Sequence, residues 1–158
     1  MDTYKIYTDG ATSGNGYEGA QGGWAWILLD ENETFLATNM CHEDNVTNNY
    51  CELRAVIDAC HFFELNEKGK DCIVYSDSAY IINCCKAKWY RNWQINGWLN
   101  SKKQPVANKE LWKKLVPYFE NPHFSFEKVA GHANNKYNNL VDEMAVKAKF
   151  MKDVSEIW

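Results

Sequence analysis

The sequence contains no apolar run of the roughly 20 residues that a membrane-spanning helix requires. Its first residues, Met1 to Ile6, carry charge and alternate in character, so the apolar centre of a secretory signal peptide is missing as well. These two absences argue against a membrane-spanning protein and against a secreted one, but they do not indicate a particular function. We expect a soluble, cytoplasmic protein with no membrane partner.

Paired cysteine motifs are also absent, although the chain has six cysteines. No two of them form a C-x-x-C pair, and adjacent Cys84 and Cys85 would point to different faces of a helix. Five lie inside apolar, periodic segments, where a reduced thiol packs as a small hydrophobic group: Cys51, Cys60, Cys72, Cys84 and Cys85. We therefore favour buried free thiols over a zinc site or a disulfide framework.

A positive net charge, which is common in proteins that bind nucleic acids, is missing too, because the formal charge is −4. The charges are unevenly distributed, however. The segment from Lys86 to Lys114 holds eight basic residues and one acid, Glu110, so it carries +7 and the rest of the chain carries −11. Four of the seven tryptophans lie in the same segment. The pattern indicates one face suited to a polyanion. The alternative, a solvated helical surface, would explain the lysines but not the tryptophans.

The 158 residues are enough for one domain with a hydrophobic core, and no linker or repeat divides them, so we expect a single domain over residues 1–158. Apolar runs and alternation predict five strands: Thr3–Asp9, Trp24–Asp30, Thr34–Met40, Cys72–Tyr75 and Phe124–Val129. Helical periodicity predicts five helices: Asn49–Gly69, Ser78–Lys86, Asn138–Met151 and one on each side of a break at Gly97–Pro105. The glycine-rich segment Ala11–Gly23 is predicted to be a loop.

The order of these elements predicts an α/β fold, with a five-stranded mixed sheet flanked by helices. The first three strands follow one another closely and should form an antiparallel meander. The fourth and fifth strands each follow a helical segment, and a helical crossover joins parallel strands. We therefore expect them to run parallel to the first strand.

Four acidic residues lie where this fold would bring them together. Asp9 ends the first strand and Asp77 ends the fourth, and the carboxyl ends of neighbouring parallel strands line a common crevice. Glu52 lies in the first turn of the intervening helix, and Asp142 lies in the closing helix after a polar loop. Four carboxylates repel one another unless cations neutralise them, which favours two Mg²⁺ ions roughly 3.5–4 Å apart. Such a pair can activate a water and stabilise the leaving oxygen in phosphoryl transfer.

Each acid also has a simpler structural explanation. Asp9 could be a turn residue and Asp142 a surface acid. Thr47, Asn48 and Asn49 are candidate N-caps of the helix, and Glu52 could complete a capping box that begins at Asn49. Asp77 could be a helix cap. Only the joint placement of the four residues favours the metal site.

Five motifs follow one another along the chain: Thr8-Asp9-Gly10-Ala11, Gly22-Gly23-Trp24-Ala25, Thr47-Asn48-Asn49 with Glu52-Leu53, Ser76-Asp77-Ser78 with Tyr80, and Gly131-His132 with Asn138 and Asp142. Together they resemble the type 1 ribonuclease H family, in its bacterial form with a basic protrusion, from about Tyr4 to Ala148. The resemblance implies the ribonuclease H-like fold. It also implies an endoribonuclease that hydrolyses the RNA strand of RNA–DNA hybrids by two-metal-ion catalysis, leaving 5′-phosphate and 3′-hydroxyl ends. Mg²⁺ is the implied cofactor, with Mn²⁺ as a substitute.

The resemblance also assigns roles to particular residues. The four acids match the family's catalytic metal ligands, and His132 matches the mobile-loop histidine that assists proton transfer and product release. Candidate contacts to the hybrid lie in the glycine loop, before Glu52 and in the protrusion: Asn15, Asn48, Asn49, Lys88, Trp89, Arg91, Lys102 and Lys103. For Trp89, Trp93 and Trp112, a role as core anchors between helices is the alternative.

Two other functions compete with this interpretation. A junction resolvase or integrase core could share the fold, but the Thr47–Asn49 segment and the basic, tryptophan-rich segment argue against it. A non-catalytic hybrid-binding module would gain nothing from four acids that face phosphates. The expected partner is an RNA–DNA hybrid, bound by a monomer without an obligate protein partner. Ala79 stands where many relatives carry glutamine, which removes one contact to the hybrid, and Ala130 replaces a common lysine before Gly131-His132.

Overall fold

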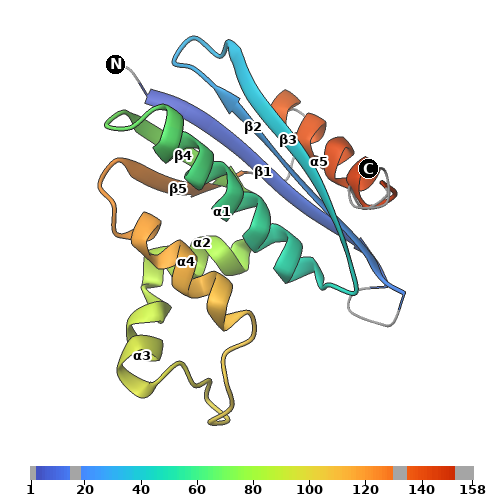
Figure 1. The fold of residues 1–158 in the computed structure, drawn as a ribbon. Coiled ribbons are helices and arrows are strands. Elements are labelled where there is room, and N and C mark those ends of the chain that lie inside the picture. The colour runs from blue at the N-terminus through green and yellow to red at the C-terminus, as the bar shows by residue number, and fades with distance from the viewer. Residues whose placement is uncertain (1–2, 15–18, 130–134, 152–158) are drawn as a thin grey trace.

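The computed structural model describes residues 3–14, 19–129 and 135–151 of the chain. One sheet contains five strands: β1 Thr3–Ser13, β2 Gln21–Leu29, β3 Phe35–Asp44, β4 Asp71–Ser76 and β5 Phe124–Lys128. Their order across the sheet is β3-β2-β1-β4-β5 (Figure 1). The pairs β1–β2 and β2–β3 are antiparallel, whereas β1–β4 and β4–β5 are parallel. The predicted α/β fold and mixed sheet are confirmed.

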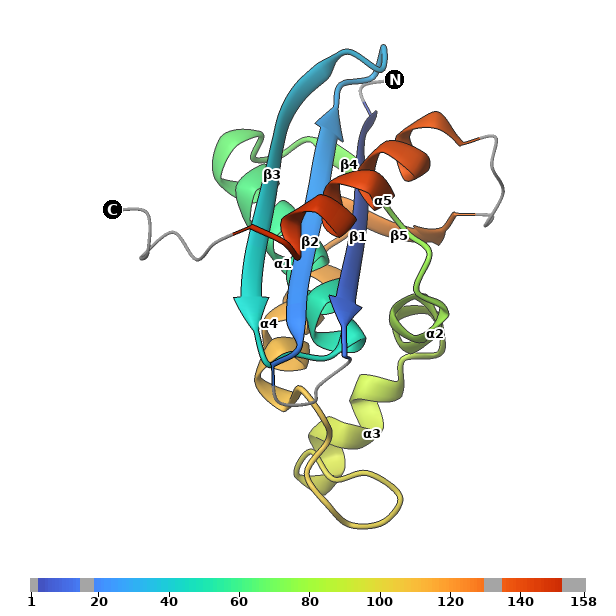
Figure 2. The same ribbon diagram turned by 90° about the vertical axis from the view of Figure 1, so that its right-hand side faces the viewer.

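The helices lie on both faces of this sheet. They are α1 Asn48–Asn66, α2 Ala79–Ala87, α3 Trp89–Asn96, α4 Lys109–Phe119 and α5 Lys136–Ala148. Figure 2 shows α5 across one face of β1, β2 and β3, with α1 and α4 behind the opposite face. Both views show α3 and the segment that joins it to α4 projecting away from the sheet. Among the described residues, no helix combines the length and the apolar character needed to cross a membrane.

The alternation of side chains along the central strands divides the core into two layers. Ile6 on β1 and Leu28 on β2 belong to the cluster that packs under α1, α2 and α4. Tyr7 and Ile27, their neighbours in the chain, belong to the cluster under α5. Successive residues of a strand point to opposite faces of its sheet. β1 and β2 are therefore apolar on both faces, which explains the nearly continuous apolar run in β2.

The glycine-rich segment is not all loop, and the predicted loop Ala11–Gly23 was wrong at both ends. Residues 11–13 continue β1 and residues 21–23 begin β2, with Ala11 paired to Gly23. A Cβ on Gly23 would overlap the backbone at the end of α5, so this glycine permits close packing of a helix on a strand. Gly23 therefore marks a close approach of α5 to β2 and not a turn.

The starts of α1 and α5 differ from the prediction by one or two residues. Of the three candidate N-caps of α1, the structure uses Thr47, whose Oγ1 accepts a hydrogen bond from the Tyr50 amide at 3.1 Å. A capping box begun at Asn49 is therefore wrong, and Glu52 is left without a role in capping the helix. α5 begins at Lys136, two residues before the predicted start, because Asn135 is its N-cap.

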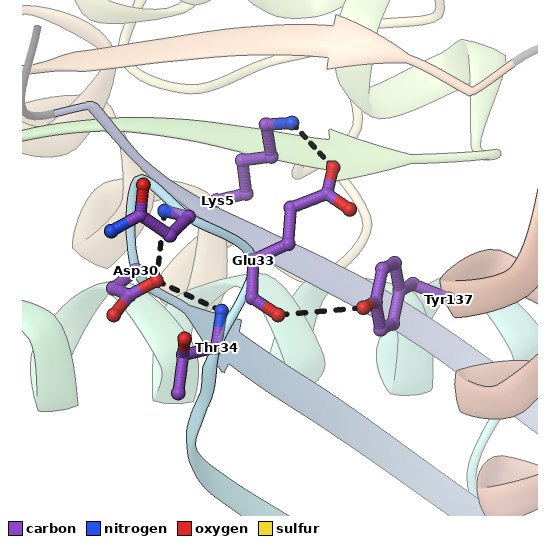
Figure 3. A network of polar contacts seen from close by, with 6 residues as sticks. Lys5, Asp30, Glu33, Thr34 and Tyr137 are labelled. Carbon is purple, nitrogen blue, oxygen red and sulfur yellow. Dashed lines mark hydrogen bonds and ion pairs between the residues drawn. The ribbon is translucent and has the colours of Figure 1, made fainter.

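The turn between β2 and β3 fixes the start of α5 (Figure 3). Asp30 Oδ1 accepts the Thr34 amide at 2.8 Å and closes the turn. Glu33 in this turn pairs with Lys5 of β1 at 2.7 Å, and its carbonyl accepts the Tyr137 hydroxyl at 3.4 Å. Because Tyr137 lies in the first turn of α5, this network helps to set where α5, which carries Asp142, crosses the sheet.

All six cysteines are free thiols, as predicted. Of the five predicted to be buried, Cys51, Cys60, Cys72 and Cys84 are buried, whereas Cys85 is only partly buried. Burial raises the pKa of the Cys51 thiol to about 12, so it stays neutral and packs as an apolar group. Among the described residues, no cysteine forms a disulfide or belongs to a group of three or more potential metal ligands.

Candidate active site

Asp9 and Glu52 meet at the backbone of Gly10. The Gly10 amide donates a hydrogen bond to Asp9 Oδ1 at 2.9 Å and another to Glu52 Oε1 at 3.2 Å. A Cβ on Gly10 would lie 2.6 Å from the carbonyl carbon of Cys51 and 2.6 Å from the Glu52 amide nitrogen. Real Cβ atoms do not approach backbone so closely, so only glycine lets β1 pass the first turn of α1 here.

Asp77 reaches the same place from β4. One carboxylate oxygen from each of Asp9, Glu52 and Asp77 lies within 4.8 Å of the other two. Asp77 directly follows Ser76, the last residue of β4, and β4 is the parallel neighbour of β1. The cap of α2 is Ser78, whose Oγ accepts the Ile81 amide at 3.3 Å, so Asp77 is not a helix cap.

Asp142 approaches the cluster from α5, on the opposite face of the sheet from α1. Asp142 raises the pKa values of Asp9, Glu52 and Asp77, so its carboxyl group lies near theirs. The structure therefore brings Asp9, Glu52 and Asp77 together within 4.8 Å, from two strand ends and one helix, and places Asp142 beside them from α5.

Burial and crowding raise the pKa values of three of these acids. Desolvation is the largest cause at Asp9, which is only 3% exposed, and the Glu52 charge adds to it. Desolvation also raises the pKa of Glu52 to about 8, with the Asp77 charge contributing. At Asp77 the causes are desolvation and then Asp142. Without a cation, the cluster therefore holds protons at neutral pH.

The donor atoms of this cluster fit a hard divalent cation. All are carboxylate oxygens, the ligands that Mg²⁺ and Mn²⁺ prefer. Glu52 Oε2 is buried and has no hydrogen-bond partner among the described residues. A buried carboxylate oxygen without a partner is unfavourable unless a cation or a proton satisfies it. The cluster is therefore a candidate metal centre.

We expect the metal-free protein to lose stability as the pH rises from about 4.5 to about 8. The Glu52 carboxyl group titrates near 4.5 when unfolded and near 8 in the fold, so in this window the folded state binds more protons than the unfolded state. The free energy of unfolding in EDTA should therefore fall across the window, and Mg²⁺ should restore it at pH 8. Urea denaturation at pH 5 and pH 8 measures both effects. Glu52→Gln is the control that should reduce the pH dependence, while the raised pKa values of Asp9 and Asp77 preserve the remainder. Equal stability at both pH values in EDTA would contradict the burial argument.

Comparison with known proteins identifies the family. Residues 1–150 match the family model described as RNase H. The chain belongs to the ribonuclease H family. Its relative "Ribonuclease H" of Thermoanaerobacter sp. (strain X514) is 44% identical over 147 residues, which cover 92% of this chain and 88% of that protein. The ribonuclease H resemblance found in the sequence is thereby confirmed.

Two solved ribonucleases H share the fold. LC9-RNase H1, described as a type 1 RNase H with the type 2 active-site motif, superposes with a TM-score of 0.72 at 26% identity, covering 94% of this chain and 72% of that one. LC11-RNase H1 in complex with RNA/DNA hybrid superposes with a TM-score of 0.67 at 23% identity, and the match covers 92% of this chain and 98% of that one. Membership of the ribonuclease H family makes this chain a metal-dependent endonuclease. It decides against the resolvase or integrase core and against the non-catalytic module.

In this ribonuclease H, the predicted hybrid contacts Asn48 and Asn49 form the exposed start of α1. Thr12 Oγ1 donates to Asn48 Oδ1 at 2.7 Å, which ties β1 to this helix start. The two asparagines line a groove of about 470 Å³ together with Ala107 and Asn108, from the segment before α4. Sequence reasoning did not place these two segments side by side, because no local pattern links them. Two predicted residues, Asn15 and His132, lie outside the described residues.

The other predicted contacts lie in the projecting segment, residues 88–108, which comprises α3 and its connection to α4. Of the tryptophans in and beside it, some pack in the core and one is exposed. Lys88, Trp89, Arg91, Lys102 and Lys103 are all exposed. Trp112 is 1% exposed, and the Trp93 ring lies 5.4 Å from it between centroids. These two are core anchors. Trp89 is 37% exposed and contacts Tyr80 edge-on, so its ring remains available to a ligand.

Proposed function

We propose that this ribonuclease H hydrolyses the RNA strand of RNA–DNA hybrids by two-metal-ion catalysis, leaving 5′-phosphate and 3′-hydroxyl ends. The proposal rests on one observation above all, the convergence of the Asp9, Glu52 and Asp77 carboxylates within 4.8 Å, with Asp142 beside them. The related fold of LC11-RNase H1, solved with an RNA/DNA hybrid, supports the same substrate.

The four acids have a common role in this proposal. Asp9, Glu52, Asp77 and Asp142 would hold two Mg²⁺ ions, with Mn²⁺ as a substitute. When bound, the ions activate a water and neutralise charge on the leaving oxygen. The chain's own part is to fix the ligands: the Gly10 amide orients Asp9 and Glu52, and the ends of β1 and β4 hold Asp9 and Asp77 side by side.

We assign proton transfer and product release to His132. β5, which precedes this residue in the chain, lies beside β4, the strand that ends next to Asp77. α5, which follows it, carries Asp142. The two elements that precede and follow residues 130–134 are therefore one that pairs with β4 and one that carries Asp142. An imidazole titrates near neutral pH, which suits it to relay a proton.

Contacts to the hybrid are divided between two regions in this proposal. Asn15, Asn48 and Asn49 are assigned to the minor groove, where the 2′-hydroxyl groups distinguish RNA from DNA. The projecting segment binds the DNA strand: Lys88, Trp89, Arg91, Lys102 and Lys103. Lysine and arginine supply salt-dependent affinity for the phosphate backbone, and the exposed Trp89 ring adds apolar contact area.

Reversing the charges of Lys102 and Lys103 should weaken hybrid binding and flatten its salt dependence. Both residues are exposed in the segment between α3 and α4. Each lost phosphate contact lowers the slope of log K against log salt by about 0.9, so Lys102→Glu with Lys103→Glu should reduce it by about 2. Fluorescence anisotropy over a salt series measures the slope. An unchanged slope would show that neither lysine contacts phosphate.

The proposed function itself is tested by cleavage of a labelled hybrid. With Mg²⁺, purified protein should cut the RNA strand internally and leave single-stranded RNA and duplex DNA intact; EDTA should stop the reaction. End-group analysis should find 5′-phosphates on the downstream products. Cleavage in EDTA would contradict the metal site, and equal cleavage of single-stranded RNA would contradict the hybrid as substrate.

We further propose that residues 1–158 form one catalytic domain, which acts as a monomer in the cytoplasm. Six free thiols suit a reducing compartment. All five strands belong to one sheet, and both core layers pack on it. Light scattering of the purified protein would test the monomer.

A further inference from the structure

Lys128 lies beside the acid cluster, outside the basic segment Lys86–Lys114. It is the last residue of β5, and its register partner on β4 is Ser76, the residue directly before Asp77. The Val129 amide donates to the Ser76 carbonyl at 3.0 Å, so the pairing of the two strands continues to this point. Strand pairing therefore fixes the backbone of Lys128 next to the end of β4.

The charge of Lys128 is not neutralised by an ion pair. Its neighbour Glu127 pairs with Lys86 at 3.0 Å, which occupies the carboxylate next to it in the chain. Among residues 3–14, 19–129 and 135–151, no acidic oxygen lies within 4.0 Å of the Lys128 ammonium group. The side chain is exposed, yet its charge is felt at Asp77, where it lowers the pKa against the larger effect of burial.

A cation at this edge has a specific use in the proposed reaction. The scissile phosphate must lie at Asp77 and the other acids, and the strand continues past the site with one negative charge per nucleotide. Outside Lys86–Lys114 the chain carries a formal −11, so acidic residues outnumber basic ones there and an unpaired lysine beside the site would offset their repulsion of phosphates. A lysine with a long, exposed stem can offer its ammonium group to such a phosphate as a point charge.

We propose that Lys128 binds a backbone phosphate of the RNA strand next to the cleavage site. This inference rests on the proposed function, because it is that function which places the RNA strand at Asp77. It adds a substrate contact that belongs neither to the acid cluster nor to the projecting segment.

The test compares Lys128→Gln and Lys128→Arg with a matched control, Lys68→Gln. Lys68 is an exposed lysine between α1 and β4, at the end of the sheet where β4 begins. Binding of a fluorescent hybrid is measured in EDTA, where no cleavage occurs, over a series of salt concentrations. KM and kcat are then measured with Mg²⁺. Thermal unfolding confirms that each variant is folded.

Lys128→Gln should weaken hybrid binding about fivefold at low salt and reduce the salt slope by about 0.7–0.9. KM should rise by a similar factor, while kcat changes less than twofold. Lys128→Arg should restore most of the affinity, because a guanidinium group also binds phosphate. Lys68→Gln should leave the slope and KM unchanged.

Other outcomes would overturn the proposal in distinct ways. An unchanged slope with a shifted Mg²⁺ requirement would show that Lys128 acts on the metal site instead. A lower kcat at constant KM would place its effect in the chemical step. No change in any variant would make it a solvated surface lysine. Failure of the unsubstituted protein to cleave hybrids would contradict the proposed function, whereas the binding comparison in EDTA tests Lys128 independently.

Discussion

Asp77→Asn should lower the rate of hybrid cleavage by about 10³-fold or more, because several kcal/mol of transition-state stabilisation depend on the metal ions. The amide has the shape of the carboxylate but lacks its charge. Asp77 lies within 4.8 Å of Asp9 and Glu52, so it is expected to share the ions with both. Single-turnover cleavage of a labelled hybrid measures the loss.

The fold and the binding of hybrid should survive this substitution. Asp77 is repelled by Asp142, and burial raises its pKa, so removing its charge relieves strain in the metal-free protein. The melting temperature in EDTA should therefore be equal to or higher than that of the unsubstituted chain. Asp71→Asn is the matched control: Asp71 begins the same strand, pairs with His123 at 2.8 Å and should leave cleavage unchanged. Substantial residual activity of Asp77→Asn would rule out this residue as a ligand.

Gly10→Ala should lower the free energy of unfolding by about 3 kcal/mol, since the added methyl group overpacks a tight contact. Its Cβ would lie 2.6 Å from the backbone at Cys51 and Glu52, where no flexible side chain can move aside. α1 must then shift away from β1, and Glu52 shifts with it. A displacement of about 1 Å at a catalytic group can cost on the order of 10²-fold in rate.

Denaturant unfolding and kcat, measured on the same preparation, test both parts of this expectation. Gly69→Ala is the control, because Gly69 has a φ of 86° and nothing within 4 Å of its added Cβ. It should cost about 1 kcal/mol of stability through backbone strain and leave kcat unchanged. If Gly10→Ala kept the stability and rate of the unsubstituted chain, α1 would have to be free to move without affecting the site.

The convergence of the acids could be predicted, because it follows from strand order and chain direction. Asp9 and Asp77 end strands whose connection by a helical crossover makes them parallel neighbours, and parallel neighbours end at the same edge. Glu52 was predicted with a competing role in a capping box, and only the position of Thr47 as N-cap removed that alternative. The sequence therefore predicts that Asp9, Glu52 and Asp77 meet, as they do in the structure, and their role as metal ligands stays a prediction.

The basic segment illustrates where prediction from the sequence reached its limit. Its charge and its four tryptophans are visible in the sequence. Whether a tryptophan supports the core or faces a ligand depends on which helices surround it. The structure buries Trp112 and leaves Trp89 37% exposed. Similarly, counting charges along the chain passed over Lys128, because its neighbour Asp77 is adjacent through strand pairing and not through sequence.

By itself, the sequence determined the number and order of the strands and helices, the parallel and antiparallel pairing, the free thiols and the meeting place of Asp9, Glu52 and Asp77. These features follow from local periodicity and chain direction. The tertiary structure alone decided that Gly10 and Gly23 serve close packing, that Glu52 is free of capping, and that Lys128 stands beside Asp77. Each of these depends on how near two distant segments approach, a quantity set by packing across the whole core and absent from any local pattern.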